Sequence, residues 1–139
     1  MLSCPLCEAQ NERLIWRDAH CRAINTPEPA YPAFCRVVWH AHVAEMSDLP
    51  VAEREHLMGV VWAVEEALRE LMKPDKINLA ALGNRVPHLH LHVIPRFHDD
   101  AHFPDAVWAE PKRSGVERRV NTSALQIALA QRLGNSLAI

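Results

Sequence analysis

Three histidines alternate with apolar residues in the segment PHLHLHVIPRF, residues 87–97. They are His88, His90 and His92. Successive side chains of a β-strand point to opposite faces, so a strand over residues 88–94 places the three imidazole rings in one row. The intervening leucines and valine then enter a core, and the rings line the open face of a rigid element.

Three kinds of chemistry fit such a row. The first is structural, with histidines satisfied by hydrogen bonds on a half-buried strand. The second is a metal site, although same-face neighbours on a strand stand about 6 to 7 Å apart and splay for a tetrahedral ion. The third is nucleophilic catalysis on phosphorus, in which a neutral central imidazole attacks a phosphate and is later released by water. In that case His90 is the nucleophile, and its neighbours donate hydrogen bonds to phosphate oxygens.

The rest of the chain predicts a small antiparallel α+β domain around this strand. A loop with three prolines occupies residues 26–33, and residues 76–82 and 88–95 are expected to form a hairpin. The predicted strands span residues 12–17, 20–25, 34–39, 76–82 and 88–95, and the predicted helices span residues 51–73 and 123–133.

Composition narrows the class of protein. The chain has 139 residues, and its net charge of −2 gives no basic field for nucleic acid. No basic start with an apolar run is visible, and the apolar stretch 59–64 is too short to cross a bilayer, so we expect a cytoplasmic protein without membrane contact. Four cysteines then argue against a disulfide framework, and Cys21 and Cys35 are expected in the core.

The segment NLAALGNRVPHLHLHVIPRF, residues 78–97, resembles the signature of the histidine-triad (HIT) family, His-φ-His-φ-His-φ-φ with φ apolar. Residues 88–94 fit that signature throughout. The pieces Ile24-Asn25, TPEPAYPAF and CRVVW also follow the family's order of strand, proline-bearing loop and apolar strand. The resemblance predicts a HIT domain over residues 1–110 and a C-terminal extension over residues 111–139, with a short helix packed on the same domain.

This resemblance implies a five-stranded antiparallel sheet with one long central helix and a C-terminal helix, built as a homodimer. It also implies hydrolysis or transfer of a nucleoside monophosphate group, of the phosphoramidase or dinucleoside polyphosphate hydrolase type. The ligand would be a purine nucleotide or nucleotide conjugate, and the chemistry would need no cofactor. The alternative is a nucleotide-binding regulatory or scaffold protein with negligible turnover, against which the intact His90 argues.

Matched position by position, the family's nucleophile falls on His90. His92 would hold a phosphate oxygen, and His88 would support the nucleophile through its backbone carbonyl. These assignments come from the resemblance and agree with the nucleophilic alternative above.

Four further positions match ligand contacts of the family. Asn25 takes the place of the residue that binds ribose hydroxyls, and Asn78 and Asn84 lie near the amides that contact the phosphate and the leaving group. Arg85 stands where many relatives carry a small hydroxyl residue beside the leaving group. It either favours a more anionic leaving group or faces solvent.

Cys4 and Cys7 have the spacing of a zinc-knuckle half-site, or else are two small buried apolar residues. Some bacterial HIT relatives complete a structural zinc site with a histidine after the third strand and the first triad histidine. The matching residues here are His42 and His88, so the resemblance implies a structural zinc held by four side chains.

The segment after the triad is rich in polar and aromatic side chains. Its cluster at residues 98–102 is expected to be a solvated turn, with a second metal site as the alternative. Trp108 is expected either to close over the nucleotide base or to pack on the partner subunit.

Overall fold

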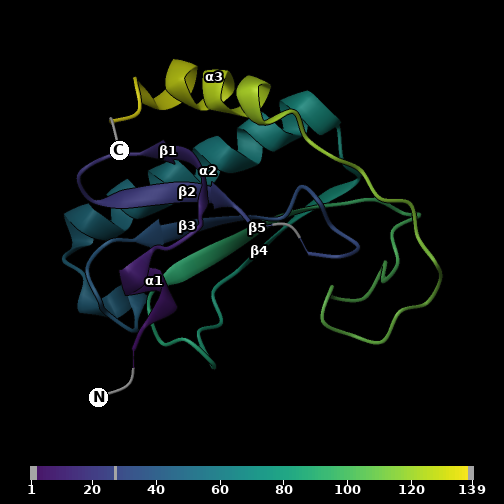
Figure 1. Ribbon diagram of the computed structural model, residues 1–139, viewed down its shortest axis with the longest axis horizontal. Coiled ribbons are helices and arrows are strands. Elements are labelled where there is room, and N and C mark those ends of the chain that lie inside the picture. Colours follow the sequence, from purple (N-terminus) through teal and green to yellow (C-terminus); the bar gives the residue numbers. More distant parts are fainter. Residues whose placement is uncertain (1–2, 27, 138–139) are drawn as a thin grey trace.

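The computed structural model describes residues 3–26 and 28–137 and contains one five-stranded antiparallel sheet (Figure 1). The strand order is β1-β2-β3-β5-β4. The antiparallel α+β fold with five strands is therefore confirmed. The strands are β1 (Arg13–Arg17), β2 (Cys21–Asn25), β3 (Cys35–Trp39), β4 (Lys76–Ala80) and β5 (His90–Arg96).

Two helices match the prediction closely. Helix α2 (Val51–Met72) ends where Lys73 adopts a left-handed conformation and Pro74 follows, because proline cannot continue the helical hydrogen bonding. Helix α3 (Thr122–Leu133) begins at Asn121, whose side chain accepts the amide hydrogen of Ala124.

Two short helical segments were not predicted. Helix α1 (Pro5–Glu8) and the 3₁₀ helix η1 (Met46–Asp48) are too short to show a hydrophobic period. Pro27 of the predicted proline loop lies outside the described residues.

Helices α2 and α3 lie together on one face of the sheet (Figure 1), and the main core lies beneath them. The triad leucines and valine enter this core as predicted. The C-terminal helix contributes Leu125 and Leu129, both fully buried, so α3 is packed on the same core as the sheet. The core residues from β5 and from the position just before it are Leu89, Leu91 and Val93.

The opposite face of the sheet carries α1 and the open side of the triad. Leu6 of α1 packs there against Ile24 and Val38, whose neighbours along the strands point into the main core. Across residues 3–26 and 28–137, no helix combines the length with the apolar character that crossing a membrane requires.

The predicted start of the triad strand was wrong. Strand β5 begins at His90, and His88 lies in the bend that precedes it. The amide of His88 donates to the carbonyl of Val86, and the amide of Leu89 donates to that of Val43, so neither belongs to the regular ladder. Pro87 offers no amide hydrogen at all. The first histidine is therefore free to turn away from the other two.

The expectation of a solvated turn over residues 98–102 holds for the exposed His98 and Asp99 but was wrong for Asp100 and His102, which are buried. Asp100 is only 2% exposed and binds the buried Arg96 through both carboxylate oxygens, at 2.7 and 3.0 Å. The same carboxylate accepts the backbone amides of Phe97, His102 and Phe103. A buried charge without these bonds would be costly, and with them the segment after β5 is fixed to the sheet.

Candidate active site and metal centre

A cavity of about 510 Å³ opens on the face of the sheet opposite α2. Its walls come from β3, β5, α1, the connection between β4 and β5, and the segment that carries Trp108. A volume of this size is typical of small-molecule sites. The polar and aromatic side chains that line it are Glu28, Arg36, Asn84, Arg85, His90, His92 and Trp108.

The hydrogen bond from His90 to its neighbour fixes the state of the central imidazole. His90 Nδ1 lies 2.6 Å from the backbone carbonyl oxygen of His88. Because a carbonyl oxygen can only accept, Nδ1 carries the proton, and Nε2 of the neutral ring presents its lone pair. Burial lowers the pKa of His90, which favours this neutral form. The arrangement is that of a poised nitrogen nucleophile.

His92 lies next to His90 on the same face of β5. The two rings meet edge to face with centroids 5.0 Å apart. Burial, with smaller contributions from His90 and Arg36, lowers the pKa of His92 to about 4, so this ring is neutral at physiological pH. Trp108 stands 5.3 Å from it, edge to face, and remains 53% exposed at the mouth of the cavity.

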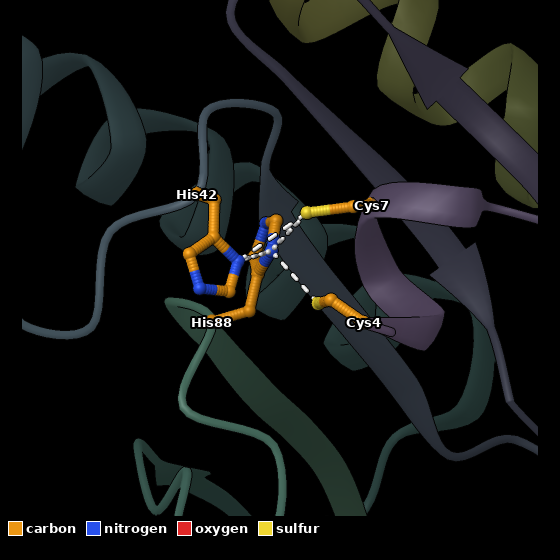
Figure 2. Close-up of side chains that lie close together, drawn as sticks. All are labelled: Cys4, Cys7, His42 and His88. Carbon is orange, nitrogen blue, oxygen red and sulfur yellow. Dashed lines mark hydrogen bonds between the residues drawn. The ribbon is translucent and has the colours of Figure 1, made fainter. Parts of the chain in front are cut away.

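His88 faces a different group of side chains. Its Nε2 lies 2.6 Å from the carbonyl oxygen of Trp39, so Nε2 carries the proton and Nδ1 is a free ligand atom. Figure 2 shows this ring and that of His42 turned toward the sulfurs of Cys4 and Cys7. One turn of helix at α1 brings the two cysteines to the same side.

The four side chains fit a tetrahedral zinc ion. Zinc bonds of about 2.0–2.1 Å to nitrogen and about 2.3 Å to sulfur place neighbouring ligand atoms about 3.3 to 3.8 Å apart. His88 Nδ1 lies 3.4 Å from the sulfur of each cysteine and 3.2 Å from His42 Nδ1. Cys7 Sγ lies 3.3 Å from His42 Nδ1. Two thiolates with two imidazoles are a common structural zinc set, so these residues could hold that metal.

A second group of potential ligands fits a metal poorly. It consists of Asp18, Cys21 and His56. Burial raises the pKa of the Cys21 thiol well above its ordinary value, and a metal needs the thiolate. One carboxylate oxygen of Asp18 already accepts the amides of His20 and Cys21 in a tight turn. This group is explained by its structural hydrogen bonds.

Of the predicted amide contacts, the structure brings one to the cavity. Asn84 and Arg85 both line it, carried by a turn in which Gly83 has a positive φ of 72°, a conformation that glycine adopts readily. Asn25 lies under the proline loop and donates to the carbonyls of Pro32 and Phe34.

Asn78 lies elsewhere, with its side-chain oxygen accepting from Arg96. Neither Asn25 nor Asn78 is among the side chains that line the cavity. Both amides are engaged in holding neighbouring segments of the chain.

Arg36 is a cavity residue that the sequence did not single out. It pairs with His92 between β3 and β5, and its Nε–H donates to His92 Nδ1 at 3.4 Å. A signal was present, because the alternation in CRVVW places an arginine on the face away from the core. This signal could place Arg36 beside His92 only once β3 was known to be the neighbour of β5.

Comparison with known proteins gives a consistent picture. A family model described as HIT domain matches residues 8–99. The AP-4-A phosphorylase of Mycobacterium tuberculosis is 31% identical over 81 residues, which cover 54% of this chain and 42% of that protein. The bis(5'-adenosyl)-triphosphatase of Saccharomyces cerevisiae is 27% identical over 92 residues, which cover 62% and 45%. The chain thus spans less than half the length of these curated relatives.

Among solved structures, a histidine triad protein from Marinobacter aquaeolei VT8 has a TM-score of 0.72 with 29% identity. The alignment covers 89% of this chain and 93% of that one. Because the family model matches about two thirds of the chain and includes all three histidines, this protein belongs to the histidine-triad (HIT) family.

Proposed function

We propose that this protein hydrolyses or transfers a nucleoside monophosphate group, taken from a phosphoramidate or a phosphoanhydride, through an intermediate on His90. The observation that carries the proposal is the 2.6 Å hydrogen bond from His90 Nδ1 to the carbonyl of His88. Because Nδ1 carries the proton, Nε2 presents its lone pair to a cavity of nucleotide size.

The reaction proceeds by two displacements. His90 Nε2 attacks the α-phosphorus, the bond to the leaving group breaks, and the nucleoside monophosphate becomes attached to His90. Water then attacks the same phosphorus, the phosphorus–nitrogen bond breaks, and the proton of the water passes to His90 or to solvent. His92 and Asn84 line the same cavity and donate hydrogen bonds to the phosphate and the leaving group.

The names of the relatives support this chemistry. One is an AP-4-A phosphorylase and the other a bis(5'-adenosyl)-triphosphatase. The adenosyl group in the second name supports a purine nucleotide as the ligand of this chain as well.

A structural zinc at Cys4, Cys7, His42 and His88 is part of the proposal. The metal would tie α1 to the bend before β5 and would hold the backbone whose carbonyl accepts from His90. Its chemistry is structural, since four protein ligands leave no open position for a substrate. A three-histidine catalytic metal finds no support, because the described ligand cluster joins His88 to the cysteines and not to the other two triad histidines.

A homodimer remains part of the proposal, carried by the family resemblance. Strand β4 stands at the edge of the sheet and leaves Leu79 partly exposed, which gives a second copy a place to pack. Light scattering at several concentrations tests this assembly, and a monomer throughout would refute it.

The function is tested by AMP release from adenosine phosphoramidate and from diadenosine tetraphosphate. We expect turnover by the natural chain and its loss in His90→Ala. His98→Ala is the matched control, since His98 is an exposed histidine outside the cavity. Release that persists in His90→Ala would sink the proposed mechanism. AMP binding without any release would favour the regulatory alternative.

A further inference from the structure

Arg36 holds the neutral ring of His92, the third triad histidine, in one tautomer. Its Nε–H donates to His92 Nδ1 at 3.4 Å, from a position directly opposite on the neighbouring strand. With Nδ1 accepting, the neutral ring of His92 carries its proton on Nε2. That N–H is then available for a phosphate oxygen in the cavity.

The charge of Arg36 has no close carboxylate, in contrast to the buried arginines. Arg22 and Arg96 each have a carboxylate oxygen within 2.7 Å of Nε. The Nη2 of Arg36 has a loose ion pair with Glu28 at 3.9 Å. Burial lowers the pKa of Arg36, which records the cost of removing this cation from water. Glu28 lines the same cavity, but its side chain is 44% exposed and too distant from Arg36 for a hydrogen bond. The half-buried guanidinium therefore leaves positive potential in its part of the cavity, and that potential attracts an anion.

Arg85 is a second cation on another wall of the same cavity, carried by the connection between β4 and β5. Guanidinium groups bind phosphate oxygens with two parallel N–H bonds. A phosphoramidate offers one phosphate, whereas a dinucleoside polyphosphate offers a chain of them. Two guanidinium groups in one cavity therefore match a substrate with adjacent phosphates.

We propose that Arg36 binds the transferred α-phosphate beside His92, and that Arg85 binds the adjoining phosphate of an anionic leaving group. The inference rests on the proposed function and refines its substrate class toward phosphoanhydrides. In the first step the bond between the α-phosphorus and the bridging oxygen breaks, and the leaving nucleoside polyphosphate takes the electron pair beside Arg85. In the second step water releases AMP from His90, as above.

The test compares two substrates that share the AMP group, adenosine phosphoramidate and diadenosine tetraphosphate. The variants are Arg36→Met, Arg36→Lys and Arg85→Met. Arg119→Met is the control, because Arg119 is exposed and lies outside the cavity lining. Urea unfolding of each variant separates a loss of binding from a loss of structure.

We expect Arg36→Met to lower kcat/KM about 100-fold on both substrates, since it removes a charged donor that meets the transferred group. Arg36→Lys recovers part of this loss, because lysine keeps the charge but not the paired geometry. Arg85→Met lowers kcat/KM about tenfold on diadenosine tetraphosphate alone. Arg36→Met within about twofold of the natural chain on both substrates overturns the role of Arg36. Equal losses on both substrates in Arg85→Met overturn the role of Arg85.

Binding measurements keep the inference distinct from the proposed reaction. If the natural chain turns over neither substrate, the proposed function fails, and calorimetric titration with AMP and ADP still tests the two arginines. Arg36→Met should then weaken AMP binding about tenfold. Arg85→Met should remove the preference for ADP over AMP. Unchanged affinities in both variants overturn the inference.

The tautomer of His92 provides a readout that a purely structural role would not move. Long-range ¹H–¹⁵N spectra should show protonated Nε2 in the natural chain and a mixture of tautomers in Arg36→Met. Protonated Nδ1 in the natural chain contradicts the positioning role.

Discussion

Replacing Asp100 by asparagine should destabilise the segment after β5 more than the same substitution at an exposed aspartate. The carboxylate accepts two bonds from Arg96 and three from backbone amides, and it is nearly inaccessible to solvent. An asparagine of the same shape directs an NH₂ group at one set of these donors. It also leaves the guanidinium of Arg96 buried without a countercharge.

Breaking one partner of a buried ion pair costs about 3–5 kcal/mol. For a chain of this size each kcal/mol shifts Tm by about 3–5 °C, so the variant should melt about 10–20 °C lower. The loss is a large part of the stability of about 5–15 kcal/mol that a typical domain has. Trp108 belongs to the same segment and lies at the mouth of the cavity, so weaker nucleotide binding should accompany the lower stability.

Urea unfolding followed by tryptophan fluorescence and circular dichroism measures the effect. Asp99→Asn is the matched control, because Asp99 is an exposed neighbour whose ion pair with Arg118 is open to solvent. The control should leave the urea midpoint nearly unchanged. A loss below about 1 kcal/mol in Asp100→Asn would refute the argument that the buried pair holds this segment.

Three other outcomes are expected. The pKa of Asp100 in the folded chain lies below its unfolded value of about 3.9. The stability difference between the natural chain and Asp100→Asn should therefore be constant above that pH and shrink as the pH falls below it. A difference that does not change with pH in urea titrations would be contrary evidence. Cys7→Ser should abolish stoichiometric zinc in elemental analysis and lower Tm, as a chelator does to the natural chain, whereas a natural chain without zinc would refute the site. Leu129→Ala should lower the free energy of unfolding by about 2–5 kcal/mol, with a single cooperative transition. Ile127 is 60% exposed on the same helix, so Ile127→Ala should lower it by about 0.5 kcal/mol or less. Two separate transitions would show that α3 does not unfold together with the core.

Features that are set by residues close together in the sequence could be predicted. Leu91 and Val93 enter the core because a strand alternates its faces, and α2 ends before Pro74 because proline breaks the helical ladder. The family signature also indicated the fold and the cluster of Cys4 and Cys7 with two histidines. The core positions and the helix end follow from residues close together in sequence, whereas the fold and the two histidines of the cluster came from the family resemblance.

Features that depend on distant pairing could not be predicted. Arg36 reaches His92 only because β3 lies beside β5 in one particular register. Asp100 is buried because Arg96 lies beneath it, although the sequence around it is as polar as a solvated turn. The amide of Asn25 is engaged by the proline loop, which no local pattern revealed.

The most direct test of the central claim is a rapid-quench experiment with diadenosine tetraphosphate, followed by intact-protein and peptide mass spectrometry. A nucleotidyl group should appear on the natural chain within the first turnover, map to His90, and be absent from His90→Ala. The hydrogen bond to His88 that frees Nε2 predicts this result. Turnover without any adduct, or an adduct on another residue, would contradict it.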